Sequence, residues 1–147
     1  MSDKSRPLVV VGVDGSPLSI EAIRWAAGYA RTIGGSLLAV TGYEVPWTIF
    51  FAPTATEEDY EKAARVVIDE AVAQALGDEP DIPVATRLVG NRPAHALTDS
   101  AAGADLLVVG SHGRGAMPGM HLGSVANYCV HHAPCPVLVY RTAQSGR

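Results

Sequence analysis

The chain has 147 residues, of which 48% are apolar, and its formal net charge is −4 at pH 7. A chain of this length suits one domain and can bury a substantial core. No segment gathers lysine and arginine, which argues against a nucleic acid or an anionic membrane as a partner.

The chain begins with a polar segment, Met1–Arg6, which is followed by an apolar run at Leu8–Val13. That run is too short for the core of a signal peptide or for a membrane span, so a cytoplasmic protein is expected. The two cysteines, Cys129 and Cys135, fit a reducing compartment. We therefore expect a single domain over residues 1–147, ordered over roughly residues 7–142.

The first predicted elements are a strand and a helix. Leu8–Val13 is rich in valine, as expected of a central parallel strand that is covered on both faces. Ser16 and Pro17 form an N-cap and first-turn pair, and the helix that they begin stops at Gly34 and Gly35. An apolar stripe follows this helix: Ile20, Ile23, Ala27 and Ala30.

A second strand is predicted over Ser36–Gly42, and the stretch after it, Glu44–Thr56, is irregular. Thr56 precedes three acidic residues, a pattern typical of a helix start, and the long helix that follows ends within Gly77–Pro83. Its predicted buried face consists of Tyr60, Ala64, Val67, Ala71 and Leu76.

The rest of the chain continues the alternation of strand and helix. Strands are predicted over Val84–Val89, Asp105–Val109 and Pro136–Arg141, and helices over Pro93–Ala101 and Ser124–His131. With right-handed crossovers, this order predicts an α/β fold, a three-layer sandwich around a parallel sheet.

The segment from Gly110 to Val125 is rich in glycine and directly follows a predicted strand. Glycine exposes backbone N–H groups and tolerates positive φ, so such a loop can wrap closely around an anion. The segment ends where a helix is predicted to begin, with Ser124 as its N-cap, and a helix start offers further unpaired N–H donors. The pattern favours a phosphate site. The glycines are Gly110, Gly113, Gly115, Gly119 and Gly123.

The glycine spacing differs from the two common phosphate-loop motifs. There is no G-x-x-x-x-G-K-[ST] pattern, and Pro118 stands where a dinucleotide fingerprint needs glycine. The spacing is instead Gly110-x-x-Gly113, nine residues, then Gly123-Ser124.

This signature closely resembles that of the universal stress protein family in its ATP-binding branch, G-x-x-G, nine residues, then G-[ST]. The resemblance extends to Val9–Ser16 and to His132–Val139, and thus covers nearly the whole chain. It departs at Ala116, where members of this branch often carry glycine.

The resemblance implies a five-stranded sheet of order 3-2-1-4-5, of the adenine-nucleotide alpha-hydrolase-like type. Ligands of such sheets bind at the carboxyl ends of the strands where the chain reverses direction. The reversal lies between the first and fourth strands, which are followed by Asp14-Gly15-Ser16 and by the Gly110 loop. Both motifs are therefore expected at one crevice.

The resemblance also implies roles for single residues. Backbone N–H groups of the signature contact the phosphates, and the Ser124 hydroxyl adds a hydrogen bond. Main-chain groups of Val40 and Thr41 hold the adenine, while Val11 and Gly12 form the floor of the pocket. The ATP-binding residues expected on this basis are Val11, Gly12, Asp14, Val40, Thr41, Gly110, Gly113, Arg114, Gly115, Gly123, Ser124 and Val125.

Two of these residues have alternative interpretations. Asp14 is either a turn residue that bonds nearby N–H groups or a carboxylate for the ribose hydroxyls or a magnesium ion. Arg114 is either a solvated charge or a cation that neutralises the β- or γ-phosphate.

Three other patterns carry less weight. The histidines and cysteines of the C-terminal third lack the pairs that complete a tetrahedral metal set, and Ser111-His112 lacks the G-x-S-x-G elbow of a hydrolase. Trp47, Phe50 and Phe51 form an apolar patch, interpreted as a lid, a local core plug or a partner surface.

The sequence thus predicts an ATP-binding universal stress protein that acts as a nucleotide-dependent stress-response regulator, with ATP and Mg²⁺ bound together. The resemblance implies a homodimer through the apolar edge strand at residues 136–141. The alternative is a weak ATPase or nucleotidyl-transfer enzyme on the same fold. A phospho-receiver domain would need an acidic cluster beside Asp14 and a lysine after the last strand, and neither is present.

Overall fold

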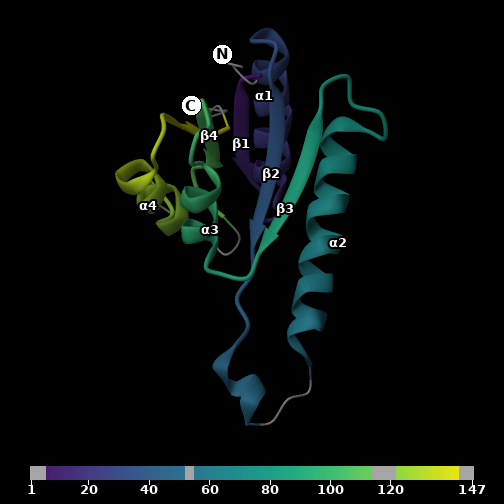
Figure 1. Ribbon diagram of the computed structural model, residues 1–147, viewed down its shortest axis with the longest axis vertical. Coiled ribbons are helices and arrows are strands. Elements are labelled where there is room, and N and C mark those ends of the chain that lie inside the picture. Colours follow the sequence, from purple (N-terminus) through teal and green to yellow (C-terminus); the bar gives the residue numbers. More distant parts are fainter. Residues whose placement is uncertain (1–5, 52–54, 114–121, 143–147) are drawn as a thin grey trace.

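The computed structural model describes residues 6–51, 55–113 and 122–142, in which strands and helices alternate along the chain (Figure 1). The strands are β1 (Leu8–Gly12), β2 (Ser36–Gly42), β3 (Val84–Val89), β4 (Leu106–Gly110) and β5 (Val137–Tyr140). The helices are α1 (Pro17–Thr32), α2 (Glu57–Leu76), α3 (Pro93–Ser100) and α4 (Ser124–His132), with a 3-10 turn, η1 (Trp47–Phe50).

The five strands form one parallel sheet in the order β3-β2-β1-β4-β5, which confirms the predicted topology. In β1, Val9 and Val11 are fully buried in a cluster with α1 and α2, whereas Val10 lies in a second cluster with α3 and α4. Helices therefore cover both faces of the sheet. This arrangement explains why the central strands consist of continuous apolar residues.

Local signals set the ends of α1 and α2. The Ser16 hydroxyl accepts a hydrogen bond from the Ser19 N–H at 3.2 Å, and Pro17 occupies the first turn of α1. At the start of α2, Thr56 and Asp59 form a reciprocal capping box, with N···O distances of 2.8 and 3.2 Å. Gly77, at φ 78°, ends α2 in a conformation that side chains rarely adopt.

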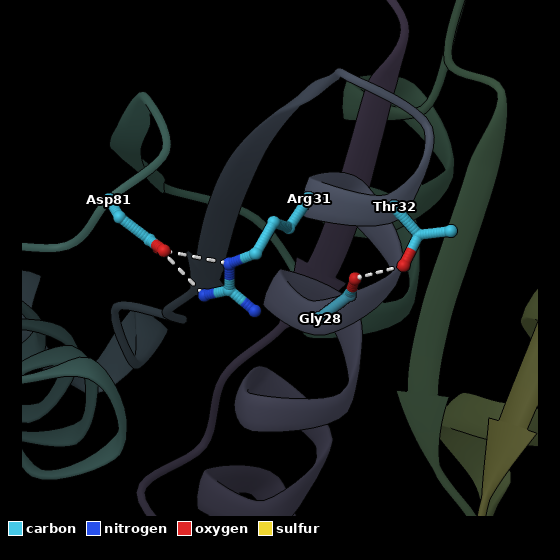
Figure 2. A network of polar contacts seen from close by, with 4 residues as sticks. All are labelled: Gly28, Arg31, Thr32 and Asp81. Atoms are coloured by element: carbon cyan, nitrogen blue, oxygen red, sulfur yellow. Dashed lines mark hydrogen bonds and ion pairs between the residues drawn. The ribbon is translucent and has the colours of Figure 1, made fainter.

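The end of α1 is tied to the segment before β3. The Arg31 guanidinium donates two hydrogen bonds to the Asp81 carboxylate, at 2.9 and 2.7 Å, and the Thr32 hydroxyl donates to the Gly28 carbonyl (Figure 2). Arg31 holds the pKa of Asp81 below its usual value through this hydrogen bond. Because both side chains are exposed, the pair contributes little to stability.

The structure corrects several predicted details. The buried face of α2 consists of Ala64, Ile68 and Ala71, and the predicted Val67 is only half-buried. β4 begins and ends one residue later than predicted, and β5 is shorter by one residue at each end. The N-cap of α4 is Gly123, not Ser124, which is instead the first residue of the helix.

In the part of the chain that the structure describes, no helix is both long and apolar enough to cross a membrane.

Candidate functional site

A cavity of about 370 Å³ lies at the carboxyl ends of β1 and β4, where the strand order reverses. Its volume is in the range of small-molecule sites. Three groups of residues line it. The end of β1, the turn after it and the start of α1 contribute Gly12, Val13, Asp14 and Ser19, and β2 and α3 contribute Val40, Gly42, Pro93 and Leu97. The third group comes from β4, α4 and the described residues between them: Val109, Gly110, His112, Gly113, Gly123, Ser124, Val125 and Ala126. The two predicted motifs therefore meet at one site.

Asp14 is held in place by the turn that it forms with the start of α1. Its Oδ1 accepts a hydrogen bond from the Ser16 N–H at 2.9 Å, and its own N–H donates to the Ser19 hydroxyl at 3.2 Å. The interpretation as a turn residue is thus confirmed for Oδ1. The other carboxylate oxygen, Oδ2, is directed toward the opposite wall of the cavity, at Gly113.

Gly113 lies next to the Asp14 carboxylate. A Cβ atom placed on it would lie 2.7 Å from Asp14 Oδ2, a distance that real Cβ atoms do not show. Its φ is not among the positive values found for the described glycines. The second glycine of the signature therefore leaves the space that the Asp14 carboxylate occupies, and backbone strain plays no part.

Gly123 has a different reason for lacking a side chain. A Cβ atom there would lie 3.0 Å from His112 Cα and 3.3 Å from the Ser111 carbonyl oxygen. The Gly123 N–H donates to that carbonyl at 2.6 Å, so this group has a backbone partner where a phosphate contact was expected. The first backbone hydrogen bond of α4 runs from the Asn127 N–H to the Gly123 carbonyl.

The start of α4 borders the cavity and carries backbone donors. The N–H groups of Ser124, Val125 and Ala126 precede the first hydrogen-bonded turn and have no acceptor within the helix. Together with the positive end of the helix dipole, they favour an anion in this part of the cavity.

The opposite part of the cavity is apolar. Val40 and Gly12 line it as predicted, and Pro93 and Leu97 of α3 close it. A Cβ atom on Gly12 would lie 2.7 Å from a Leu97 methyl group, so glycine lets α3 pack against the end of β1. The predicted Val11 and Thr41 are not among the lining residues.

The side chains of Val11 and Thr41 have other contacts. Val11 is fully buried in the cluster beneath α1 and α2, and the Thr41 hydroxyl donates to the Val13 carbonyl at 2.8 Å. The strand period explains the difference, because neighbouring residues of a strand face opposite sides of the sheet. Arg114 and Gly115 lie outside the described residues.

The sequence analysis missed eight lining residues: Val13, Ser19, Gly42, Pro93, Leu97, Val109, His112 and Ala126. Pro93 and Leu97 could have been found, because they follow the carboxyl end of β3, at the same edge of the sheet as the two motifs. Ser19 carried no signal, since its position depends on the hydrogen bond that it accepts from Asp14.

Metal and thiol chemistry gain no support from the described residues. Among them, no group of three or more His, Cys, Asp or Glu side chains could hold a metal ion. Both cysteines are free, and burial raises the pKa of Cys129 to about 11 and also raises the pKa of Cys135. A thiol with a raised pKa is a poor nucleophile at neutral pH.

Comparison with known proteins gives two kinds of relatives. A universal stress protein of Mycobacterium tuberculosis (strain H37Rv) is 39% identical over 145 residues, which cover 95% of this chain and 47% of the relative. The chain thus spans about half the length of the curated relatives it matches.

Among solved structures, a universal stress protein in complex with cAMP is 26% identical, with a TM-score of 0.72, over 95% of this chain and all of that one. A universal stress protein family protein from Arabidopsis thaliana with AMP bound has a TM-score of 0.61 over 95% of this chain and 94% of that one. At 19% identity, the second likeness shows the fold alone.

The model of the Universal stress protein family matches residues 7–141, a span that contains all five strands and every residue lining the cavity. With this match and the mycobacterial relative, the chain belongs to the universal stress protein family.

Proposed function

We propose that the cavity binds an adenine nucleotide, with ATP and Mg²⁺ as the preferred ligand. One observation carries the proposal: a carboxylate oxygen of Asp14 and the N-terminus of α4 border the same cavity, next to an apolar part. A nucleotide needs all three features, because it combines an apolar base, ribose hydroxyls and a charged phosphate chain.

In this proposal the base lies against Val40, Pro93 and Leu97, and the phosphates lie at the N–H groups of Ser124 and Val125. The Ser124 hydroxyl, exposed at the cavity, supplies a further hydrogen bond. The space for the phosphates is kept free of side chains by Gly110, Gly113 and Gly123. In the sequence, the loop continues with Arg114 and Gly115.

Asp14 is the proposed contact for the ribose hydroxyls or the magnesium ion. Hard oxygen ligands suit Mg²⁺, which usually binds one or two carboxylates and the substrate phosphates. The space that a Gly113 side chain would fill lies directly at Asp14 Oδ2, so this oxygen is within reach of a group in the cavity. The chemistry that the ion supplies is neutralisation of phosphate charge.

One related structure supports a nucleotide as the ligand. The 26% identical universal stress protein was solved in complex with cAMP, which contains adenine, ribose and phosphate. The corresponding proposal for this chain places these groups in a cavity of about 370 Å³.

We propose a regulatory role rather than catalysis. Phosphoryl transfer needs a group that positions the attacking nucleophile as well as donors for the phosphates. Among the described residues that line the cavity, only Asp14 and His112 ionise, and Asp14 is engaged in its turn. A nucleotide that is held but not consumed can act as a signal, and the protein then responds to its concentration.

We further propose that two copies pair through β5. This strand pairs with β4 on one side, and all four of its residues are half-exposed. Among the described residues no strand pairs with its other side, and the N–H and C=O groups of such an edge tend to recruit a second strand. A twofold axis would satisfy both edges with one self-complementary surface.

Calorimetry with MgATP tests the binding proposal. Asp14→Asn keeps the size of the side chain and removes its charge, so we expect the affinity to fall by about 1–2 kcal/mol, as for a charge-assisted hydrogen bond. Asp78→Asn, an exposed acidic residue after α2, is the matched control and should bind as the parent does. Failure to bind any adenine nucleotide at millimolar concentration would refute the proposal, and rapid release of ADP would favour the ATPase alternative.

A further inference from the structure

The η1 turn presents three aromatic side chains to solvent. Trp47, Phe50 and Phe51 are 70%, 73% and 77% exposed. The turn is nevertheless well formed: the Ile49 N–H donates to the Pro46 carbonyl at 3.1 Å, and the Phe51 N–H to the Thr48 carbonyl at 3.0 Å. The rings of Trp47 and Phe51 meet edge to face, with centroids 5.3 Å apart.

This aromatic turn, residues 46–51, stands away from the body of the protein. In Figure 1 it lies beyond the carboxyl ends of β2 and β3, at the end of the molecule opposite both chain termini. None of its residues in η1 is buried, and it makes no extensive contact with another described helix or strand. The interpretation as a local core plug is therefore wrong.

The exposed apolar area at this turn is large for a small protein. An aromatic side chain covers roughly 150–250 Å², so three rings at this exposure present roughly 300–550 Å². The largest patch on a typical monomer has about this size and is often functional. A well-formed turn with exposed aromatic side chains is typical of an interaction surface.

The charges around the aromatic turn indicate what it binds. Residues 43–61 contain five acidic residues and no lysine, arginine or histidine. All five are exposed: Glu44, Glu57, Glu58, Asp59 and Glu61. Lys62 follows and lies 3.8 Å from Glu58, an exposed pair of small effect. The aromatic turn is therefore an apolar surface within an acidic segment.

This charge disfavours two occupants. Two copies that met turn to turn would bring ten carboxylates together, twice the five of each chain. An anionic membrane surface would repel the same residues. An apolar and positively charged partner satisfies both features, because the rings supply the buried area while opposite charge steers the encounter and selects the partner.

We propose that the aromatic turn is a docking site for a cationic amphipathic segment of another protein. Such a segment places apolar side chains against Trp47, Phe50 and Phe51 and lysine or arginine beside the acidic residues at the start of α2. The site lies outside the nucleotide cavity, and the proposal does not depend on nucleotide binding.

The test uses Trp47 as its own reporter. The chain contains two tryptophans, so Trp25→Phe leaves Trp47 as the single one. The probe is a short amphipathic peptide of leucine and lysine, and the same pattern of leucine and glutamate is its charge-reversed control. We expect the leucine–lysine peptide to shift the Trp47 emission to the blue in a saturable manner, and we expect no shift with the leucine–glutamate peptide.

Calorimetry with the same peptide tests which residues carry the binding. The combined change Trp47→Ser, Phe50→Ser and Phe51→Ser should weaken binding by at least about tenfold. Val130→Ser removes an exposed apolar side chain elsewhere, on α4, and should leave affinity unchanged. Because the three rings are exposed, circular dichroism should show both variants to be folded.

Four outcomes would overturn the proposal. They are equal affinity of the triple serine variant, equal binding of the leucine–glutamate peptide, a blue shift of Trp47 on raising the protein concentration alone, and a blue shift with lipid vesicles but not with the leucine–lysine peptide. The third would assign the turn to self-association, and the fourth would assign it to a membrane surface.

Discussion

Gly113→Ala is the sharpest test of the site, because the structure isolates a steric cause. The new Cβ would lie 2.7 Å from Asp14 Oδ2, and the backbone at Gly113 has no positive φ that would strain an alanine. The Asp14 carboxylate must therefore move. Such a movement disturbs the 2.9 Å hydrogen bond that Oδ1 accepts from the Ser16 N–H, or turns Oδ2 away from the cavity.

The size of the effect follows from the contact that Asp14 is proposed to make with the nucleotide or its ion. A carboxylate that turns away loses this charge-assisted contact in the bound state, which costs about 1–2 kcal/mol. We therefore expect the affinity for MgATP in calorimetry to fall by roughly 5- to 30-fold. The larger Gly113→Val should abolish binding, while the far-UV circular dichroism stays native.

A double-mutant cycle separates this cause from a general disturbance of the loop. In an Asp14→Ala background, the oxygen that alanine at position 113 would displace is gone, so Gly113→Ala should cost little more. The two changes should therefore be strongly non-additive. The reasoning fails if Gly113→Ala binds within a factor of two of the parent, or if its cost is the same in both backgrounds.

Three further predictions concern stability and assembly. Gly28→Ala should raise the free energy of unfolding, measured by urea titration, by roughly 0.5–1 kcal/mol. The reason is that Gly28 lies inside α1 and a Cβ atom there would meet nothing within 4 Å. A lower free energy of unfolding would contradict this prediction. Burial raises the pKa of Cys129 from 9.0 to about 11, so its contribution to stability is fully present below pH 9 and is lost as pH rises through 11. Unfolding at pH 8 and pH 10.5 should show a steeper decline for the parent than for Cys129→Ala, and equal slopes would show that the thiol does not matter. Val139→Pro should shift a dimer toward monomer in light scattering. The carbonyls of Pro136 and Tyr140 accept hydrogen bonds from the neighbouring chain segment at β4, so the backbone groups of alternate residues of β5 point toward β4. The Val139 N–H therefore points to the open edge, and proline removes this donor. A wild-type monomer at micromolar concentration, or a Val139→Pro protein that stays dimeric, would refute the proposed interface.

Much of the fold could be predicted because the signals were local. β2 and β3 have the predicted bounds, and α1 begins at the Ser16-Pro17 pair. The predicted buried residues are wrong where tertiary contacts decide which side of a helix packs against the sheet. On α2, the spacing of three and four residues admits either Val67 or Ile68 on the buried face, and packing against the sheet selects Ile68.

The candidate site was predicted only in part. The sequence could show that glycine stands at position 113, but the reason, a carboxylate almost 100 positions earlier in the chain, depends on the fold. Gly123 rather than Ser124 caps α4, because the backbone bond to Ser111 fixes where the helix begins. The exposure of the aromatic turn could not be predicted, since apolar composition is the same for a core plug and a partner surface.

The position of β1 has a consequence for how the protein is made. Of the five described strands β1 is synthesised first, yet it lies at the centre of the sheet. The Leu8 N–H donates a hydrogen bond to the Asp105 carboxylate, 97 positions later, at 2.8 Å. Until β4 has been synthesised, one edge of this apolar strand stays open to incorrect pairing. Such distant contacts slow folding. The cavity cannot form before α4 has been synthesised, because residues of α4 line it. A ligand of the cavity therefore binds only the folded state and shifts the folding equilibrium toward that state by mass action.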